Sequence, residues 1–270
     1  MGRKKKSLSD SVETETVIFE VGDETATAGS LTDKIEKTRT RQKSYLMDLR
    51  IHSPASLGYL AIEGIDTAPA LVRLAKVKGL DVIAVTDFYS GKYLDRIQSA
   101  ARESSLTIIP GVVIRCSIPT CDDVVLSCLF PENYTTSSIE DFLRALQIPQ
   151  SAFGDKKHIV AMPFEQILAT VERFNGVALP SRMDKTPHRM AALPLLVEKY
   201  GFRAFDLAYP DSSRFFKARW PKIKFHLFSF SNANALAQVG SRIAKVKMKD
   251  PGFAGIRDIV ARNSTEGSNA

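Results

Sequence analysis

The chain has 270 residues, of which 44% are hydrophobic and 25% charged, and its formal net charge is +7. This composition is ordinary for a globular protein and excludes a collagen, a coiled coil and a wholly disordered chain. The positive charge is spread along the sequence, at +1 over residues 1–44, +3 over 45–240 and +3 over 241–270. A diffuse excess favours weak attraction to anions over a dedicated nucleic-acid-binding domain.

The predicted elements begin after a polar N-terminal region. Residues 1–44 are rich in Ser, Thr, Glu and Lys, so we predict a flexible extension in which only residues 16–21 resemble a strand. The basic run Lys4–Lys6 is consistent with nucleic-acid contact, but a solvated tail is the favoured interpretation. At the other end, residues 251–270 are predicted to form a C-terminal tail, following a domain over 45–250.

Strand-like and helix-like segments alternate between these ends. The predicted strands cover residues 45–51, 80–86, 106–115 with a break at Pro110-Gly111, 124–130, 177–180, 204–208 and 224–228. The predicted helices cover residues 67–78, 92–104, 137–146 with Ser137 or Ser138 as the cap, 163–174, 188–200 and 233–239. Alternation of this kind indicates a parallel sheet. Because no Gly-rich dinucleotide motif is present, we predict an α/β barrel rather than a doubly wound sheet.

The cysteines and the absence of long apolar runs bear on the cell compartment. The spacings of Cys116, Cys121 and Cys128 fit neither a zinc motif nor a disulfide framework, so we predict reduced, half-buried thiols. No apolar run approaches 18 residues, and the basic start lacks the apolar segment of a signal peptide. The prediction is therefore a cytoplasmic protein without a membrane partner.

Polar residues follow several predicted strands, where a parallel barrel carries its chemistry. The segments are DLRIHS at 48–53, TDF at 86–88, PGVVI at 110–114, LPSRMDK at 179–185 and SNAN at 231–234. Together they resemble the motifs of the polymerase and histidinol phosphatase (PHP) family, which read DLHxHS, TDH, PGxE, IPAH and SDAH. The five motifs occur in the family order over about residues 45–248.

The resemblance implies a distorted (βα)7 TIM-like barrel of PHP type, with three divalent metals at a phosphoesterase or nuclease site. It places the metal pocket at ten positions, which are Asp48, Arg50, His52, Asp87, Phe88, Val113, Arg182, Asn232, Asn234 and, in the fourth strand, Val125. Of the family's ligands, only His52 and Asp87 remain. Arginine has no lone pair to donate, and two ligands cannot hold three metals. No resident cofactor is therefore expected.

Three interpretations of the altered pocket remain open. In the first, Asp87 forms a buried ion pair with Arg50 or Arg182, and His52 is a hydrogen-bonded core histidine. In the second, Arg50, Arg182 and Lys185 form a phosphate site, because guanidinium groups match phosphate oxygens. In the third, Asp48, His52 and Asp87 retain one divalent metal, such as Mn, Zn or Mg.

Residues 214–224 (RFFKARWPKIK) form the densest basic and aromatic segment. Such a segment can contact phosphates and stack on bases. The favoured interpretation is an amphipathic helix with Phe215, Phe216 and Trp220 packed inward.

The leading functional hypothesis is a non-catalytic binding or structural protein, a PHP-like pseudoenzyme. Its expected ligand class is a phosphorylated molecule or a nucleic acid. The alternative is a metal-dependent phosphoesterase with a reduced site. Scattered histidines, including His158, His188 and His226, receive no predicted role.

Overall fold

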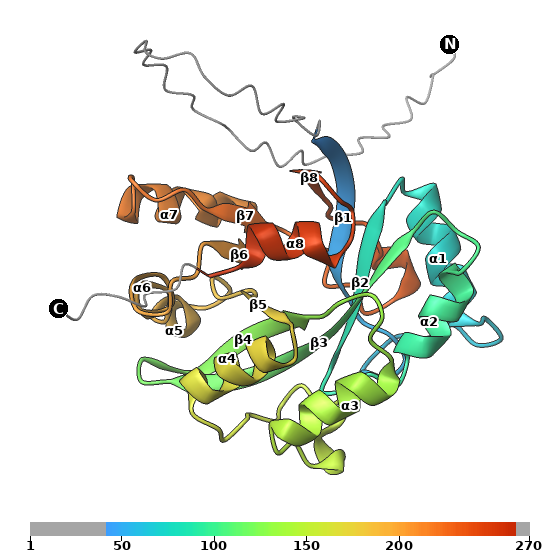
Figure 1. The fold of residues 1–270 in the computed structure, drawn as a ribbon, viewed down its shortest axis with the longest axis horizontal. Coiled ribbons are helices and arrows are strands. Elements are labelled where there is room, and N and C mark those ends of the chain that lie inside the picture. The colour runs from blue at the N-terminus through green and yellow to red at the C-terminus, as the bar shows by residue number, and fades with distance from the viewer. Residues whose placement is uncertain (1–41, 263–270) are drawn as a thin grey trace, which may run out of the picture.

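The computed structural model describes residues 42–262. The strand predicted over residues 16–21 and the run Lys4–Lys6 lie outside the described residues. Within them the chain has a mixed α/β fold, with a curled sheet of six strands and helices packed around it (Figure 1).

The six-stranded sheet has the order β5-β4-β3-β2-β1-β8. Its strands are β1 (Lys43–Ile51), β2 (Val82–Phe88), β3 (Thr107–Ile118), β4 (Cys121–Leu129), β5 (Val177–Pro180) and β8 (Ala244–Met248). A separate parallel pair consists of β6 (Ala204–Asp206) and β7 (His226–Phe228). Isolated bridges link the two sheets, between Ser181 and Asp206 and between Ile51 and Ala233. These links bring the ends of β1, β5, β6 and β7 to one region.

The predicted parallel sheet is wrong for β4, and a closed seven-stranded barrel is not confirmed. β1, β2 and β3 are parallel, whereas β4 is antiparallel to β3 and β5, and β8 is antiparallel to β1. Only Pro119 and Thr120 separate β3 from β4. A parallel pair needs a crossover of a dozen or more residues. A two-residue connection therefore imposes an antiparallel hairpin.

The break predicted at Pro110-Gly111 is also wrong, because β3 runs through both residues. Gly111 packs closely against the neighbouring strands. A Cβ at this position would lie 2.8 Å from Cγ2 of Thr86 and 3.0 Å from Cδ2 of Leu129. The glycine here permits close side-chain packing rather than a turn.

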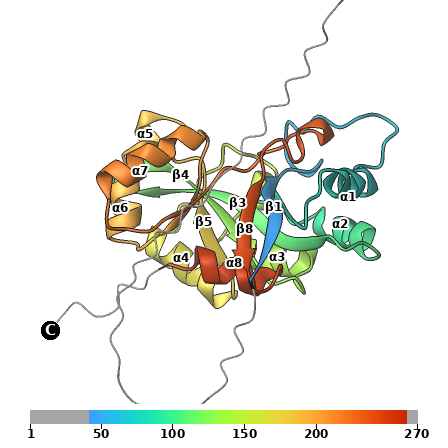
Figure 2. The same cartoon turned by 90° about the horizontal axis from the view of Figure 1, so that it is seen from above.

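Apart from the last one, the main helices follow the predicted order. They are α1 (Thr67–Val77), α2 (Leu94–Ala101), α3 (Thr136–Ala145), α4 (Phe164–Arg173), α5 (Pro187–Met190), α6 (Leu193–Glu198), α7 (Ser213–Arg219) and α8 (Phe253–Val260). Three 3₁₀ turns cover Gln150–Ala152, Pro210–Ser212 and Leu236–Gln238. In Figure 2, α5, α6 and α7 gather at one side of the sheet, and α1 and α2 at the other.

Several helix details differ from the predictions. The helix predicted over residues 188–200 is divided into α5 and α6, because Pro194 lacks an N–H and its ring would clash with the carbonyl of Met190. The helix predicted over 233–239 is only a 3₁₀ turn. The cap of α3 is Thr135, whose side chain accepts from the Ser138 N–H, rather than Ser137 or Ser138.

The segment predicted as a C-terminal tail contains α8. Phe253, Ile256 and Val260 of this helix are buried against the inner face of the curled sheet, in a cluster that includes Met47 and Leu49 of β1. The adjacent strand β8, which the sequence analysis did not predict, covers the free edge of β1. Packed structure therefore continues beyond the predicted boundary at residue 250.

Candidate functional site: a cationic cavity

The cavity of interest lies where β1, β2 and β5 end. Arg50 lies in β1, and His52 is the first residue after that strand. Phe88 ends β2, and Arg182 lies two residues after the end of β5. The segment after β7 is held against β1, since the His52 N–H donates to the Ala233 carbonyl at 2.8 Å. This contact brings Asn232 and Asn234 to the same cavity, which has a volume of about 370 Å³.

Positive charge dominates the cavity wall. The seven cationic residues of the lining are Arg50, Arg115, Lys156, Lys157, Arg182, Lys185 and Arg189. The rest of the lining is His52, Ser56, Leu57, Gly58, Phe88, Val125, Asn232 and Asn234. No Asp or Glu of the described residues lines it. The wall therefore resembles an anion site more than a cation site.

Arg50 is buried at the base of this cavity and has 2% relative exposure. Its Nε donates to Oδ1 of Asn232 at 2.7 Å, and its Nη1 donates to Oγ of Ser127 at 3.1 Å. Within residues 42–262 no carboxylate lies within 4.0 Å of its guanidinium. Burial lowers the pKa of Arg50 to about 10, so the group remains charged at neutral pH. A buried charge with only neutral partners is costly unless an anion joins it.

Arg182 is a second cation of the lining, and it is partly buried. Its backbone has a φ of +54°, in the left-handed region that non-glycine residues rarely adopt, and its N–H donates to the Asp206 carbonyl at 2.6 Å. Its Nη1 is buried and has no hydrogen-bond partner among the described residues. Strained backbone geometry that aims a cation into a cavity is typical of a functional site.

Asp206, at the end of β6, is the carboxylate whose charge bears most on both arginines. Its Oδ1 accepts from the Phe230 N–H at 3.0 Å, while its Oδ2 is buried without a partner in the described chain. It forms no ion pair with either arginine within 4.0 Å. Sequence analysis missed Asp206, because it lies in the middle of the strand predicted over residues 204–208, whereas the observed strand ends at it.

The predicted ion pair between Asp87 and Arg50 or Arg182 is wrong. Asp87 instead accepts from the N–H and Oγ of Ser53, at 2.7 and 2.5 Å, and from Oγ of Ser56 at 2.7 Å. The Asp87 carboxylate is therefore hydrogen-bonded by two serines instead of pairing with an arginine. Burial is the main cause that raises the pKa of Asp87 to about 6.

Asp48 is also committed to backbone contacts. Its carboxylate accepts from the N–H groups of Ser231 and Gly240 at 3.2 and 3.1 Å. Burial raises its pKa to about 6. Neither Asp48 nor Asp87 contributes to the cavity lining, and Val113 is fully buried within β3.

His52 lines the cavity as a neutral ring. It stacks on Phe88, with ring centroids 5.3 Å apart and an interplanar angle of 9°. Burial, followed by the nearby charge of Arg50, lowers its pKa to about 3. Its Nδ1 lies 3.4 Å from Oγ of Ser56. Ser56 and Phe88 therefore orient the ring.

These residues do not fit the three-metal cluster that the resemblance implies. The lining offers one imidazole and two neutral amides, and the two permanent cations Arg50 and Arg182 occupy ligand positions. The carboxylates Asp48 and Asp87 are engaged outside the wall.

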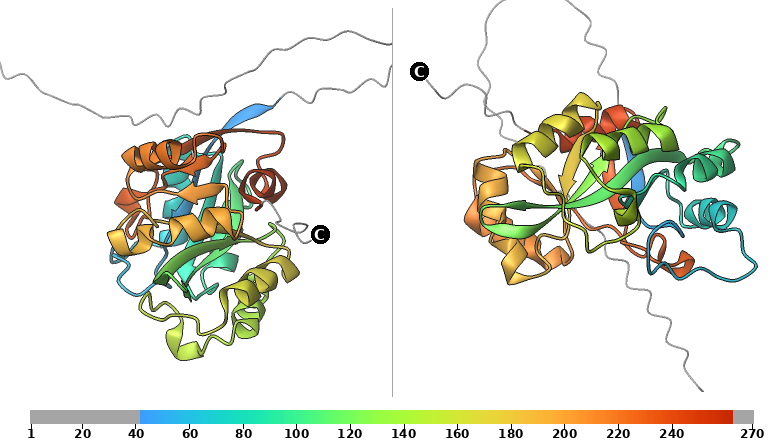
Figure 3. Two further views of the ribbon diagram at one scale, coloured as in Figure 1. Left: turned by 90° about the vertical axis from the view of Figure 1, so that its left-hand side faces the viewer. Right: turned by 90° about the horizontal axis from the view of Figure 1, so that it is seen from below.

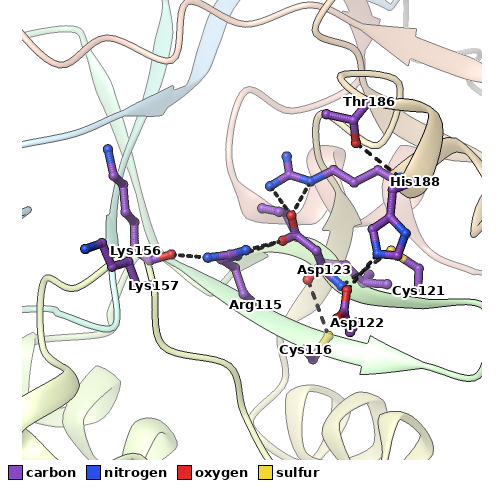
Figure 4. A network of polar contacts seen from close by, with 12 residues as sticks. Arg115, Cys116, Cys121, Asp122, Asp123, Lys156, Lys157, Thr186 and His188 are labelled. Atoms are coloured by element: carbon purple, nitrogen blue, oxygen red, sulfur yellow. Dashed lines mark hydrogen bonds and ion pairs between the residues drawn. The ribbon is translucent and has the colours of Figure 1, made fainter.

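The cavity rim includes cations that sequence analysis missed. Arg115 and Arg189 both pair with Asp123, at 2.7 and 2.8 Å, and Nη1 of Arg115 donates to the Lys156 carbonyl at 2.6 Å (Figure 4). Lys156 and Lys157 are exposed and belong to a loop between α3 and α4. These side chains do not follow predicted strands, so no strand-end pattern could identify them.

Lys185, which the sequence analysis did predict, is an exposed residue of the lining. Burial, followed by the charges of Arg182 and Arg189, lowers its pKa. The neighbouring cations of the wall thus add to the effect of burial on this pKa.

The basic and aromatic segment 214–224 lies elsewhere and follows the favoured interpretation. Phe216 is fully buried and Trp220 nearly so, and both contact Phe225 with ring centroids 5.2 and 5.8 Å apart. The aromatic rings therefore belong to the core and are not available to stack on bases.

The three cysteines are free and buried, rather than half-buried as predicted. None of the helices described between residues 42 and 262 has the length and apolar character needed to cross a bilayer.

No known family model matches the chain, and no curated protein matches it. Solved structures do share its fold. A lesion-specific endonuclease from Pyrococcus furiosus, PfuEndoQ, superposes with a TM-score of 0.57 at 18% identity, over 81% of this chain and 56% of that one. Endonuclease Q in complex with a 27-mer duplex substrate that has an abasic lesion at the active site gives 0.55 at 17% identity, over 80% and 56%.

An amidohydrolase from Chromobacterium violaceum, with bound sulfate and no metal, gives a TM-score of 0.53 at 13% identity, over 81% of this chain and 98% of that chain. The chain thus spans about 56% of the length of the endonucleases that it matches. At these identities the likeness concerns the fold alone. It is consistent with the PHP resemblance of the sequence motifs.

Proposed function

We propose that this chain is a phosphate-binding protein on a hydrolase fold, and that guanidinium groups replace metal ions as its phosphate ligands. The observation that carries the proposal is the burial of Arg50, without a carboxylate partner in the described chain, at the base of a cavity with seven cationic lining residues. An anion that enters this cavity would meet Arg50, which has no carboxylate within 4.0 Å among residues 42–262, and three exposed lysines of the lining.

Arg50 and Arg182 suit the inner phosphate. Arg50 is oriented by Asn232 and Ser127, and Arg182 has an unpartnered Nη1. Hydrogen bonds between guanidinium and phosphate are charge-assisted and roughly twice as strong as neutral ones. Because Asn232 and Ser127 hold the Arg50 guanidinium in place before the ligand arrives, little side-chain entropy of Arg50 would be lost on binding.

The rim suggests a ligand with more than one phosphate. Lys156, Lys157 and Lys185 are exposed lining residues that form no ion pair within residues 42–262. They would contact a second or third phosphate outside the one bound by Arg50 and Arg182. We therefore propose a polyphosphate or a phosphorylated end of a nucleic acid as the ligand class. The nucleic acid is supported at the level of fold only, by the likeness to an endonuclease seen with duplex DNA.

We further propose that binding occurs without hydrolysis. A general base at neutral pH would need a pKa near 7, whereas the pKa of His52 is about 3. Asp48 and Asp87 are engaged by backbone and serine donors away from the wall. Water activation thus has no suitable group in the lining.

The second candidate function is a metal-dependent phosphoesterase that holds one ion at Asp48, His52 and Asp87. The fold likeness to an endonuclease favours it. This candidate requires the two aspartates to leave their present hydrogen bonds, which the phosphate-binding proposal does not.

Calorimetric titration of the full chain with pyrophosphate and with an oligonucleotide carrying a 5′ phosphate tests the proposal. Binding should weaken at least about tenfold, or about 1.4 kcal/mol, in Arg50→Gln and in Arg182→Gln. Arg102→Gln, which removes an exposed arginine at the end of α2, is the matched control and should bind normally. The same oligonucleotide without its 5′ phosphate separates end recognition from general backbone attraction.

A parallel turnover assay in Mn²⁺, Mg²⁺ or Zn²⁺ decides between the two functions. Release of phosphate that disappears in His52→Ala would establish the phosphoesterase and overturn the non-catalytic proposal. Equal pyrophosphate affinity in wild type, Arg50→Gln and Arg182→Gln would overturn the phosphate site itself.

A further inference from the structure

Cys121, Asp122 and His188 form a cluster on the outer side of the cavity wall, near the end of the β3–β4 hairpin. The two views of Figure 3 show this hairpin reaching the short helices α5 and α6. One donor atom from each of the three side chains lies within 4.8 Å of the others. Among the described residues, no other group of three His, Cys, Asp or Glu side chains meets this condition.

The cluster has one buried side and one open side. Cys121 is buried, whereas the side chains of His188 and Asp122 have 56% and 80% relative exposure. Nε2 of His188 lies 2.6 Å from Oδ1 of Asp122, and Sγ of Cys121 accepts from the Asp123 N–H at 3.4 Å (Figure 4). An ion could therefore enter from solvent and keep a water molecule as its remaining ligand.

Local structure shapes the backbone on both sides of the cluster. A register shift between Cys116 and Ile118 disturbs the pairing of β3 and β4 just before Cys121, as bulges do where a side chain must be re-aimed. On the facing helix, Oγ1 of Thr186 accepts from the Arg189 N–H at 3.2 Å and caps α5.

Ion pairs next to the cluster fix α5 against the hairpin. Asp123, which follows Asp122, pairs with Arg189, which follows His188, at 2.8 Å. The same carboxylate also pairs with Arg115 of β3 at 2.7 Å. Contacts around the ligands that hold their orientation commonly strengthen metal binding.

We propose that Cys121, Asp122 and His188 bind a zinc ion, with water as the fourth ligand. A thiolate, an imidazole and a carboxylate suit Zn²⁺, while Mg²⁺ and Ca²⁺ prefer oxygen donors alone. On binding, the Cys121 thiol forms the sulfur–zinc bond and releases its proton to solvent. The ion would join the hairpin to α5 and so hold Arg189 in the cavity wall.

This site differs from the pocket that the PHP resemblance implies. Its ligands lie outside the five motifs, and Cys121 and His188 do not line the cationic cavity. Its test needs no phosphate ligand, so its failure and that of the phosphate-binding proposal are distinguishable.

The test is a titration of the metal-stripped full chain with Zn²⁺, followed by metal analysis after desalting. We expect about one zinc per chain in the wild type and loss of stoichiometric zinc in Cys121→Ser and in His188→Gln. His158→Gln and Asp141→Asn, which change the same residue types elsewhere, are the controls and should retain the ion.

Cobalt gives a second readout. Co²⁺ bound through Cys121 should produce thiolate-to-cobalt absorption in the near ultraviolet that is absent in Cys121→Ser and present in both controls. Circular dichroism will show whether each variant is folded. Because the His188 side chain is largely exposed, His188→Gln should disturb the fold less than Cys121→Ser.

Less than stoichiometric zinc in the wild type would overturn the proposal. Zinc that persists in folded His188→Gln, or a cobalt spectrum without a thiolate band, would do the same.

Discussion

Arg50 and Asn232 are 182 positions apart in sequence, and Nε of the arginine donates to Oδ1 of the asparagine at 2.7 Å. Both occupy positions where the sequence motifs resemble metal-ligand positions of the PHP family. The pair orients the guanidinium without neutralising it, since the amide carries no charge. In the proposed function, this uncompensated guanidinium is the group that an incoming phosphate would meet first.

Asn232→Asp should neutralise the buried cation while keeping the side-chain shape. The new carboxylate would pair with Arg50 and repel an incoming phosphate, so pyrophosphate affinity should fall at least about tenfold. Calorimetric titration measures this change. Asn175→Asp, which makes the same charge change in the exposed turn after α4, should bind like the wild type. Unchanged affinity in Asn232→Asp would show that the charge of Arg50 is not used.

Arg50→Met should separate stability from binding. Removing a buried charge in favour of an apolar side chain of similar length is expected to leave the free energy of unfolding unchanged or to raise it by about 1–4 kcal/mol in phosphate-free buffer. Urea denaturation measures this quantity, with Arg102→Met as the exposed control. If Arg50→Met instead lowers the free energy of unfolding by more than about 2 kcal/mol, the hydrogen bonds of Arg50 to Asn232 and Ser127 stabilise the fold without any ligand.

Ligand-dependent stabilisation gives an independent measure of the same site. Pyrophosphate at about 100 times its dissociation constant should raise wild-type stability by about 2.7 kcal/mol, or the melting temperature by about 5–10 °C. In Arg50→Met the increase should be much smaller at the same concentration, and it should shrink in the wild type as salt rises. A scanning calorimeter detects both effects, and equal increases in the two proteins would contradict the site.

Asp87 should make the chain less stable as the pH rises. Its pKa is about 6 in the folded chain and 3.8 ordinarily, so the folded state binds the proton more tightly. Its contribution to stability is therefore fully present below pH 3.8 and is lost as the pH rises through 6.

Comparison with Asp87→Asn isolates this effect, because the amide can retain contacts with Ser53 and Ser56. The free energy of unfolding of the wild type minus that of the variant should decrease from about pH 4 to pH 6 and then level off. Urea denaturation at several pH values provides the curve. A difference that increases over this range would show that Asp87 is instead stabilised as a carboxylate.

The basic and aromatic segment around α7 should matter for stability rather than for binding. Phe216→Ala leaves a cavity among Phe205, Trp220 and Phe225 and should cost about 3–5 kcal/mol. Joint replacement of Arg214, Lys217 and Arg219 by Gln should change stability by no more than about 0.5 kcal/mol and leave pyrophosphate affinity unchanged. Titration of the triple variant provides the check, and a marked loss of affinity would assign this surface to the ligand.

The sequence by itself determined the order of most elements and the position of the cavity. Apolar patterns and strand-end motifs are local, and so they identified β1, β2, β5 and the cavity residues Arg50, His52, Phe88, Arg182, Asn232 and Asn234. The direction of β4 was accessible as well, because residues 116–123 between the two predicted strands are fewer than the dozen that a parallel crossover needs. The all-parallel prediction overlooked that length.

Only the tertiary structure decided which groups meet. Asp87 contacts serines of the β1–α1 segment instead of an arginine, and Arg50 finds its amide partner 182 positions away. Arg189 and Lys156 reach the cavity from a short helix and a loop, and His188 approaches Cys121 across 67 positions. Hydrogen bonds and charge interactions act over a few ångströms in space, so spacing in the chain carries no record of them until the sheet has curled and the hairpin has met α5.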